Sequence, residues 1–138
     1  MRNGKPNPKN FPYWEDVVKG LKVKNYHVIQ VGVKNEKEIL GVDEVLFNQP
    51  LEELEKLIKK CKTWVAVDNF FPHLCRLQAK SGIVIFGQSD PDIFGHPENI
   101  NLLKDKTYLR EKQFDIWETV TYTNECFVDA QTVLNSID

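Results

Sequence analysis

The sequence predicts an α/β fold, in which helices cover a mostly parallel sheet of about four strands. Short apolar runs rich in β-branched residues alternate along the chain with segments of helical periodicity, and this alternation is typical of parallel sheets. Two of the runs, 63–67 and 83–86, are nearly continuous, as in strands that are buried on both faces. Since crossovers between parallel strands are right-handed, we expect a Rossmann-like, three-layer domain that spans residues 1–138.

Five segments have the composition of strands, because β-branched and other apolar residues are concentrated in them. They lie at residues 26–31, 45–47, 63–67, 83–86 and 101–103. The last of them has the weakest pattern, so about four strands are expected in the sheet.

Helices are expected in five segments, most of which repeat apolar residues every three or four positions. They lie at residues 13–22, 36–40, 51–61, 71–80 and 128–137. The third is the clearest, because its leucines form one apolar stripe with Ile58 and Cys61. Gly41 and Gly82 are expected to end the second and fourth helices.

The two ends of the chain are predicted to be less regular. Residues 1–12 are rich in proline, asparagine and lysine and are expected to form an irregular arm. Residues 98–138 are expected to form a C-terminal extension. Its aromatic residues, among them Phe114, Trp117 and Phe127, are interpreted as packing rather than as a stacking platform, because few arginines lie between them.

Composition and charge exclude several classes of protein. The 138 residues are 41% hydrophobic and 28% charged, which is typical of a globular chain. The formal net charge of −2 gives no basic field, so neither nucleic acid nor an anionic membrane is expected as a partner. No apolar run approaches the roughly 20 residues that span a bilayer, and no signal peptide is expected.

The sequence gives no sign of a metal centre or of a common catalytic motif. Its cysteines, 3 in number, are widely spaced, and no group of His and Cys has the spacing of zinc ligands. The G-x-S-x-G, P-loop and G-x-G-x-x-G motifs are missing. Neither a metal nor a cofactor is therefore expected, and free thiols favour the cytoplasm as the location.

Glycine, proline and polar residues gather where three of the predicted strands end. These segments are residues 32–36, 68–73 and 87–91. In open α/β sheets, ligands bind beyond the carboxyl ends of the strands. Topology and composition together therefore predict a binding site at this edge of the sheet.

The segment 68–73 carries the strongest candidates, which are Asp68, Asn69 and His73. A helix N-terminus offers free N–H groups and a positive partial charge, which suit a diphosphate. His73 in the first turn can donate a hydrogen bond to a phosphate or sugar oxygen. The alternative is that Asp68 and Asn69 only cap the helix, and that His73 is only a packed or solvated side chain.

Weaker candidates lie in the other segments. Gly87 permits a close approach of the backbone and Ser89 offers a hydroxyl, although turn formation alone explains both. Glu36 has the charge to bind a ribose diol, or it is simply a carboxylate at a helix start. Lys9 has the charge to meet a phosphate, or it is a solvated lysine.

In this order the segments resemble the C-terminal half of the heptosyltransferase-like glycosyltransferases, the family of the ADP-heptose:lipopolysaccharide enzymes. Four elements carry the resemblance, which runs from about Lys9 to Pro97. They are Lys-x-aromatic-Pro at 9–12, Gly-x-x-x-Glu at 32–36, Val-Asp-x-x-x-x-His-Leu at 67–74 and Phe-Gly-Gln-Ser-Asp-Pro at 86–91.

The resemblance implies the donor-binding domain of the two-domain GT-B arrangement, and a nucleotide-diphosphate sugar as its ligand. By position, Lys9 would approach the donor phosphates, Glu36 the ribose and Asp68 the sugar. The other residues that the resemblance places at the donor are Asn69 and His73, beside the diphosphate, and Gly87 and Ser89, in the pocket lining.

The chain also departs from the family pattern. Asn69 and Phe70 stand where the family usually has a small hydroxyl residue and a glycine, so Phe70 and Phe71 are expected to narrow the phosphate cradle. The family's acceptor domain and catalytic base have no match in the chain, and residues 1–8 are poor material for its first strand. Transfer would then need an acceptor domain from a partner chain or a homo-oligomer.

Three functions remain open on this reasoning. The first is a glycosyltransferase donor domain. The second is a non-catalytic module derived from that fold, which binds a nucleotide or a sugar. The third is a structural or interaction protein that keeps only the fold. The third function predicts that Phe70 or Phe71 fills the space above Asp68.

Overall fold

The computed structural model describes residues 7–115 and 120–137, so residues 1–6 of the predicted arm and Trp117 lie outside the described residues. The chain forms two compact units, and each is described by itself. The first unit consists of the residues up to Pro12 and of Lys62–Val128, and the second of Tyr13–Cys61 and the residues from Asp129.

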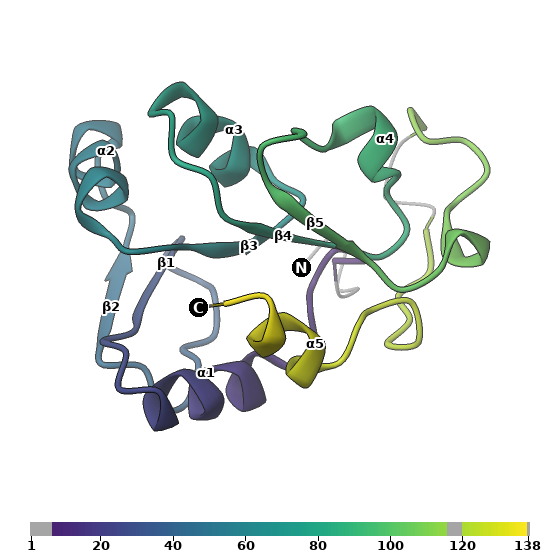
Figure 1. The fold of residues 1–138 in the computed structure, drawn as a ribbon. Helices are drawn as coiled ribbons and strands as arrows, with labels where there is room; N and C mark the ends of the chain where they lie inside the picture. The colour runs from purple at the N-terminus through teal and green to yellow at the C-terminus, as the bar shows by residue number, and fades with distance from the viewer. Residues whose placement is uncertain (1–6, 116–119, 138) are drawn as a thin grey trace. The chain divides into compact units, whose positions relative to one another are not determined.

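The first unit is built on a parallel sheet in the order β3-β4-β5 (Figure 1). Its strands are β3 (Val65–Val67), β4 (Ile83–Phe86) and β5 (Ile100–Leu103). Every residue of the central strand β4 is buried, as its continuous apolar run predicts. Because all three strands run in the same direction, their carboxyl ends meet at one edge of this sheet.

Helices α3 (Phe70–Leu77) and α4 (Pro91–Phe94) follow β3 and β4 and lie on the same face of this sheet (Figure 1). The 3-10 helix η1 (Lys106–Tyr108) follows β5. Neither α4 nor η1 is expected from the sequence, because each is too short to show a periodicity. Both begin at an aspartate whose carboxylate accepts a hydrogen bond from a backbone N–H two residues later.

Gly82 is needed at its position for packing rather than for helix termination. Helix α3 ends earlier, at Leu77, and Ala79 takes a left-handed φ of 55°. The indole of Trp64 lies against Gly82, where a Cβ atom would be 2.3 Å from the ring. The predicted stop at Gly82 is therefore wrong, and the glycine makes room for a buried tryptophan.

The second unit holds a two-stranded parallel sheet and three helices. Its strands are β1 (Ile29–Gly32) and β2 (Glu44–Phe47), and its helices are α1 (Trp14–Val23), α2 (Leu51–Lys60) and α5 (Ala130–Asn135). Helix α5 packs on α1, with Leu134 so close to Gly20 that a Cβ atom there would lie 2.2 Å from it. Lys24 Nζ donates to the carbonyl oxygens of Leu134, in the last turn of α5, and of Ile137, which follows the helix.

The helix expected at 36–40 does not form, and this prediction is wrong. The buried side chain of Gln30 holds the segment instead. Its Oε1 accepts from the N–H of Ile39 at 2.7 Å, and its Nε2 donates to the carbonyl oxygen of Lys37 at 3.0 Å. These bonds occupy backbone groups that a helix would use itself. Gly41, with φ at 97°, turns the chain toward β2.

The structure confirms the α/β class and the parallel pairing of the strands. The strands form sheets of two and three members rather than the one sheet of about four that the sequence predicts. Within the described residues, no helix is both long enough and apolar enough to cross a membrane.

Candidate functional site

An open pocket of about 390 Å³ lies in the first unit, beyond the carboxyl end of β3. It contains four of the residues that the sequence predicts for a donor site, together with five that it does not. The predicted residues are Lys9, Asp68, Asn69 and His73, and the others are Phe94, Arg110, Gln113, Phe114 and Asp115.

Lys9 and Asp68 form an ion pair in this pocket. Lys9 Nζ donates to Asp68 Oδ2 at 3.2 Å, with 27% of the lysine side chain and 11% of the aspartate side chain exposed. Asp68 follows the last residue of β3, so the strand carries its carboxylate directly to the sheet edge. The pair is shielded from water on most sides, which strengthens it relative to a surface pair.

Asn69 caps α3, and its side chain accepts a hydrogen bond from the N–H of Phe71 at 3.0 Å. The next residue, Pro72, has no N–H group to donate. The start of α3 therefore offers fewer backbone donors to an anion than a helix N-terminus usually does. The cap supports the alternative interpretation of Asn69 as a capping residue, although Asn69 also lines the pocket.

Phe70 and Phe71 do not line the pocket, contrary to the expectation that they narrow it. The side chain of Phe70 faces solvent, with 62% of the residue exposed. Phe71 packs edge-on against Trp64, with their ring centroids 5.8 Å apart. The space beside Asp68 is therefore left open by both rings.

His73 belongs to a polar cluster on the exposed side of α3. Its Nδ1 lies 2.7 Å from Nε2 of His96, and the two rings meet edge to face. Arg76 contacts both His96 Nδ1, at 3.2 Å, and the carboxylate of Glu98. Burial, followed by the positive charges of His73 and Arg76, lowers the pKa of His96. The lowered pKa favours the neutral imidazole of His96, in which one ring nitrogen can accept a hydrogen bond from a neighbouring donor.

The segment 110–115 forms the opposite wall and is held in place by hydrogen bonds. Gln113 Nε2 donates to the carbonyl oxygens of Gln88 and Arg110, while its Oε1 accepts from the N–H of Asp90. Arg110 Nη2 donates to the carbonyl oxygens of Gln113 and Asp115. These contacts join the wall to the loop after β4, and no local sequence pattern indicates them.

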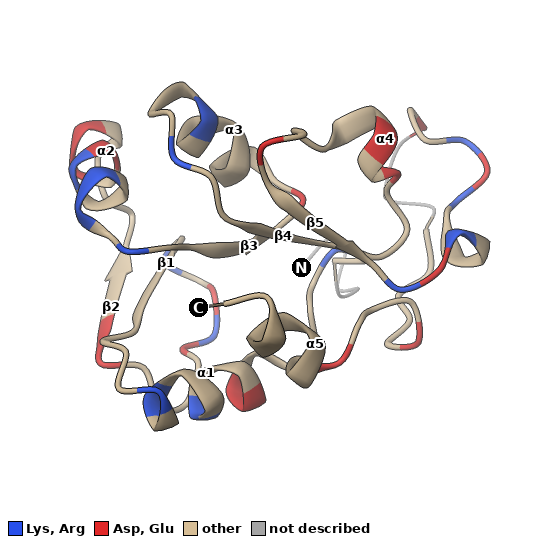
Figure 2. Cartoon of the chain, in the orientation of Figure 1, with Lys and Arg blue, Asp and Glu red and all other residues tan. Residues whose placement is uncertain are grey.

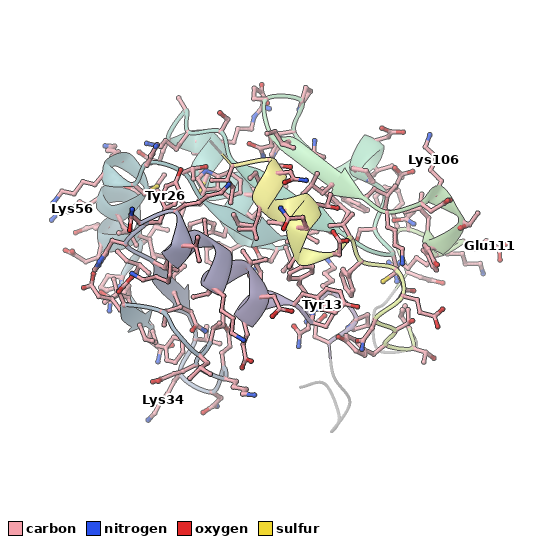
Figure 3. The ribbon with its side chains drawn as sticks, turned by 60° about the horizontal axis from the view of Figure 1, so that its bottom comes forward. Tyr13, Tyr26, Lys34, Lys56, Lys106 and Glu111 are labelled. Atoms are coloured by element: carbon pink, nitrogen blue, oxygen red, sulfur yellow. The ribbon has the colours of Figure 1, made fainter. Side chains whose placement is uncertain are left out.

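Charged residues are missing from β3, β4 and β5, and in the first unit they lie in the helices and loops (Figure 2). Lys106 and Glu111 project away from the ribbon and take no part in the pocket (Figure 3). The charged side chains that line the pocket are two of each sign, Lys9, Arg110, Asp68 and Asp115, with His73 beside them. The lining therefore has little net charge and many hydrogen-bonding groups.

Gly87 and Ser89 lie outside the pocket lining. Gly87 is packed under Cys126 and Phe127, and a Cβ atom on it would be 2.8 Å from the Cys126 sulfur. Ser89 is 2% exposed. Burial and packing account for both residues, and their predicted contact with a donor stays a prediction.

Glu36 belongs to the second unit and is exposed after the end of β1. Its carboxylate folds back against Gly32, where a Cβ atom would be 2.3 Å from Glu36 Oε2. The Gly-x-x-x-Glu spacing thus has a local cause, since only glycine leaves room for that carboxylate. Its predicted contact with a ribose stays a prediction.

Comparison of the chain with protein-family models, with curated proteins and with solved structures finds no match. Among the described residues, no group of three or more His, Cys, Asp or Glu side chains is arranged to hold a metal ion. The case for a function therefore rests on the pocket and its residues.

Proposed function

We propose that the chain is a glycosyltransferase-like donor domain whose pocket beyond β3 binds a nucleotide-diphosphate sugar. One observation carries this proposal. Residues 9, 68, 69 and 73, which the family resemblance assigns to the donor, line a single pocket although the first is far from the others in sequence. Their position at the carboxyl edge of a parallel sheet is where α/β proteins bind ligands.

The chemistry of the lining suits such a ligand. Lys9, His73 and Arg110 carry N–H groups of the kind that donate hydrogen bonds to phosphate oxygens. Asp68 and Asp115 can accept hydrogen bonds from sugar hydroxyls. In a transfer reaction, the cationic side chains would stabilise the negative charge that grows on the leaving diphosphate.

None of the described residues is assigned as a catalytic base, and in this proposal the base belongs to an acceptor domain that faces the pocket. A binding protein without catalysis is the second candidate. It is favoured by the capped start of α3, where Asn69 and Pro72 leave few backbone donors for a diphosphate. Release of nucleotide from the bound donor, with or without an added acceptor, distinguishes the two candidates.

The test is calorimetric titration of the chain with UDP-, GDP- and ADP-sugars. We expect one of them to bind, and Asp68→Asn and His73→Ala to weaken its binding about tenfold or more. Asp92→Asn is the matched control, because Asp92 is an exposed acid of the same unit that does not line the pocket. Failure of every sugar to bind at about millimolar concentration would overturn the proposal.

A further inference from the structure

We propose that Phe114, supported by Phe94, is a stacking platform for the sugar ring of the bound donor. This inference rests on the proposed function. It specifies that the wall formed by residues 110–115 recognises the sugar of the donor. Both phenyl rings line the pocket, with their centroids 5.4 Å apart and their planes inclined at 63°.

Phe114 is a large apolar side chain that is 81% exposed and, unlike the equally exposed Leu77, it lines the pocket. Exposed phenylalanines gain little from the hydrophobic effect, and an exposed apolar surface beside polar groups is typical of binding sites. Phe127 in the same C-terminal extension is only 2% exposed, as expected of a residue that packs in the interior. Interior packing does not explain Phe114.

The backbone on both sides of Phe114 is held by hydrogen bonds. Arg110 Nη2 donates to the carbonyl oxygens of Gln113 and Asp115, the two neighbours of Phe114. The side chain of Gln113 in turn bonds to the backbone of the loop after β4 at Gln88 and Asp90. The ring is thus presented from an ordered turn, which lowers the entropy lost when a ligand stacks on it.

The neighbouring groups favour a sugar rather than a phosphate on this ring. Asp115 lies next to Phe114 in the chain, and Asp68 lines the same pocket. Carboxylates repel phosphate but accept hydrogen bonds from hydroxyl groups. A sugar ring presents hydroxyls at its edge and an apolar C–H face, so it matches carboxylates beside a phenyl ring.

Two variants and one control test the platform. Phe114→Ala removes the ring, Phe114→Tyr keeps an aromatic face, and Leu77→Ala removes an equally exposed apolar side chain that does not line the pocket. Each is titrated with the nucleotide sugar that binds the unchanged chain and, separately, with the matching nucleoside diphosphate. Thermal unfolding of each variant checks that the fold is kept.

We expect Phe114→Ala to weaken binding of the nucleotide sugar about tenfold and to leave binding of the nucleoside diphosphate unchanged. Phe114→Tyr and Leu77→Ala should bind both ligands as the unchanged chain does. Equal weakening for both ligands would show that the ring recognises the nucleotide, and no weakening would show that it recognises neither; either result overturns the inference while the proposed function stands. If the unchanged chain binds no nucleotide sugar, the proposed function fails and the platform fails with it.

Discussion

Lys9 and Asp68 are 59 positions apart in the sequence and meet at 3.2 Å in the pocket. Asp68 is only 8% exposed, so its carboxylate depends on a partner to offset the loss of water. The ion pair therefore stabilises the fold. It also fixes two polar side chains at the place where we propose that a sugar and its phosphates bind. Mutations of either residue should affect stability as well as binding.

We expect Lys9→Met to lower the free energy of unfolding by about 1 to 2 kcal/mol, because it leaves the Asp68 carboxylate without its lysine. Urea unfolding measures the change. Lys106→Met is the control, since Lys106 is 80% exposed and lies 3.9 Å from Asp92, and it should change stability by less than about 0.5 kcal/mol. Equal effects of the two substitutions would contradict a structural role for the Lys9–Asp68 pair.

A substitution at Gly87 tests whether this glycine is needed for packing. We expect Gly87→Ala to destabilise the chain by about 1 to 3 kcal/mol, because the new Cβ atom would press on the buried Cys126 and Phe127 side chains. Thermal or urea unfolding shows the loss, with Ser81→Ala at an exposed position of the preceding loop as the control. A Gly87→Ala variant of unchanged stability would mean that this packing is looser than described.

At the scale of elements, α3 connects the fold to the pocket through its N-cap residue, Asn69. Asn69→Ala should cost about 1 kcal/mol of stability, because the N–H of Phe71 loses its side-chain acceptor. Asn69→Asp should keep the cap and the stability, while its negative charge should weaken binding of a diphosphate. Urea unfolding measures the stability of the two variants, and calorimetry measures their binding of a nucleotide sugar. An Asn69→Asp variant that loses stability as Asn69→Ala does would contradict the capping role.

The elements that the sequence predicts well are those set by local patterns. The continuous apolar run of β4 and the apolar stripe of α2 each appear within one or two residues of the expected bounds. The failed helix at 36–40 depends on Gln30, whose side chain bonds to Ile39 nine positions later. A hydrogen bond of that kind does not change the spacing of apolar residues, so the sequence pattern does not indicate it.

The pocket follows the same rule. Asp68, Asn69 and His73 can be predicted because they come directly after a strand, where topology puts a ligand. The wall at Arg110–Asp115 reaches the pocket through bonds between Gln113 and the loop after β4, 23 and 25 positions earlier. The sequence therefore predicts one side of the site, and tertiary contacts supply the other.

At the scale of the whole molecule, the lowered pKa values of His96 and of two aspartates predict how stability depends on pH. Burial and the charges of His73 and Arg76 lower the pKa of His96 from its ordinary value of 6.5. The unfolded chain therefore takes up this proton at a higher pH than the folded chain. The stability that the neutral His96 contributes is fully present above pH 6.5 and declines as the pH falls below that value.

Asp43 acts in a lower window. A hydrogen bond from Lys22, followed by one from the N–H of Val28, lowers the pKa of the Asp43 carboxyl from its ordinary 3.8. Its contribution is present above 3.8 and is lost as the pH falls further. Urea midpoints measured from about pH 8 to about pH 3 should fall in two stages. His96→Gln should remove the first stage. Asp43→Asn should reduce the second, to which Asp105 also contributes because a hydrogen bond from the N–H of Thr107 lowers the pKa of its carboxyl. A profile unchanged by both variants would contradict the assignment.

The most direct measurement of the proposed function is an amide NMR titration of the full chain with UDP-, GDP- and ADP-sugars. A donor bound beyond β3 should shift the signals of Lys9, of residues 68–73 and of residues 110–115 together, and should saturate them at one ligand concentration. Asp68→Asn should move the midpoint of these shifts to an about tenfold higher ligand concentration or beyond. If none of the three ligand classes shifts those signals, or if the shifts avoid the pocket, the chain does not bind a donor there.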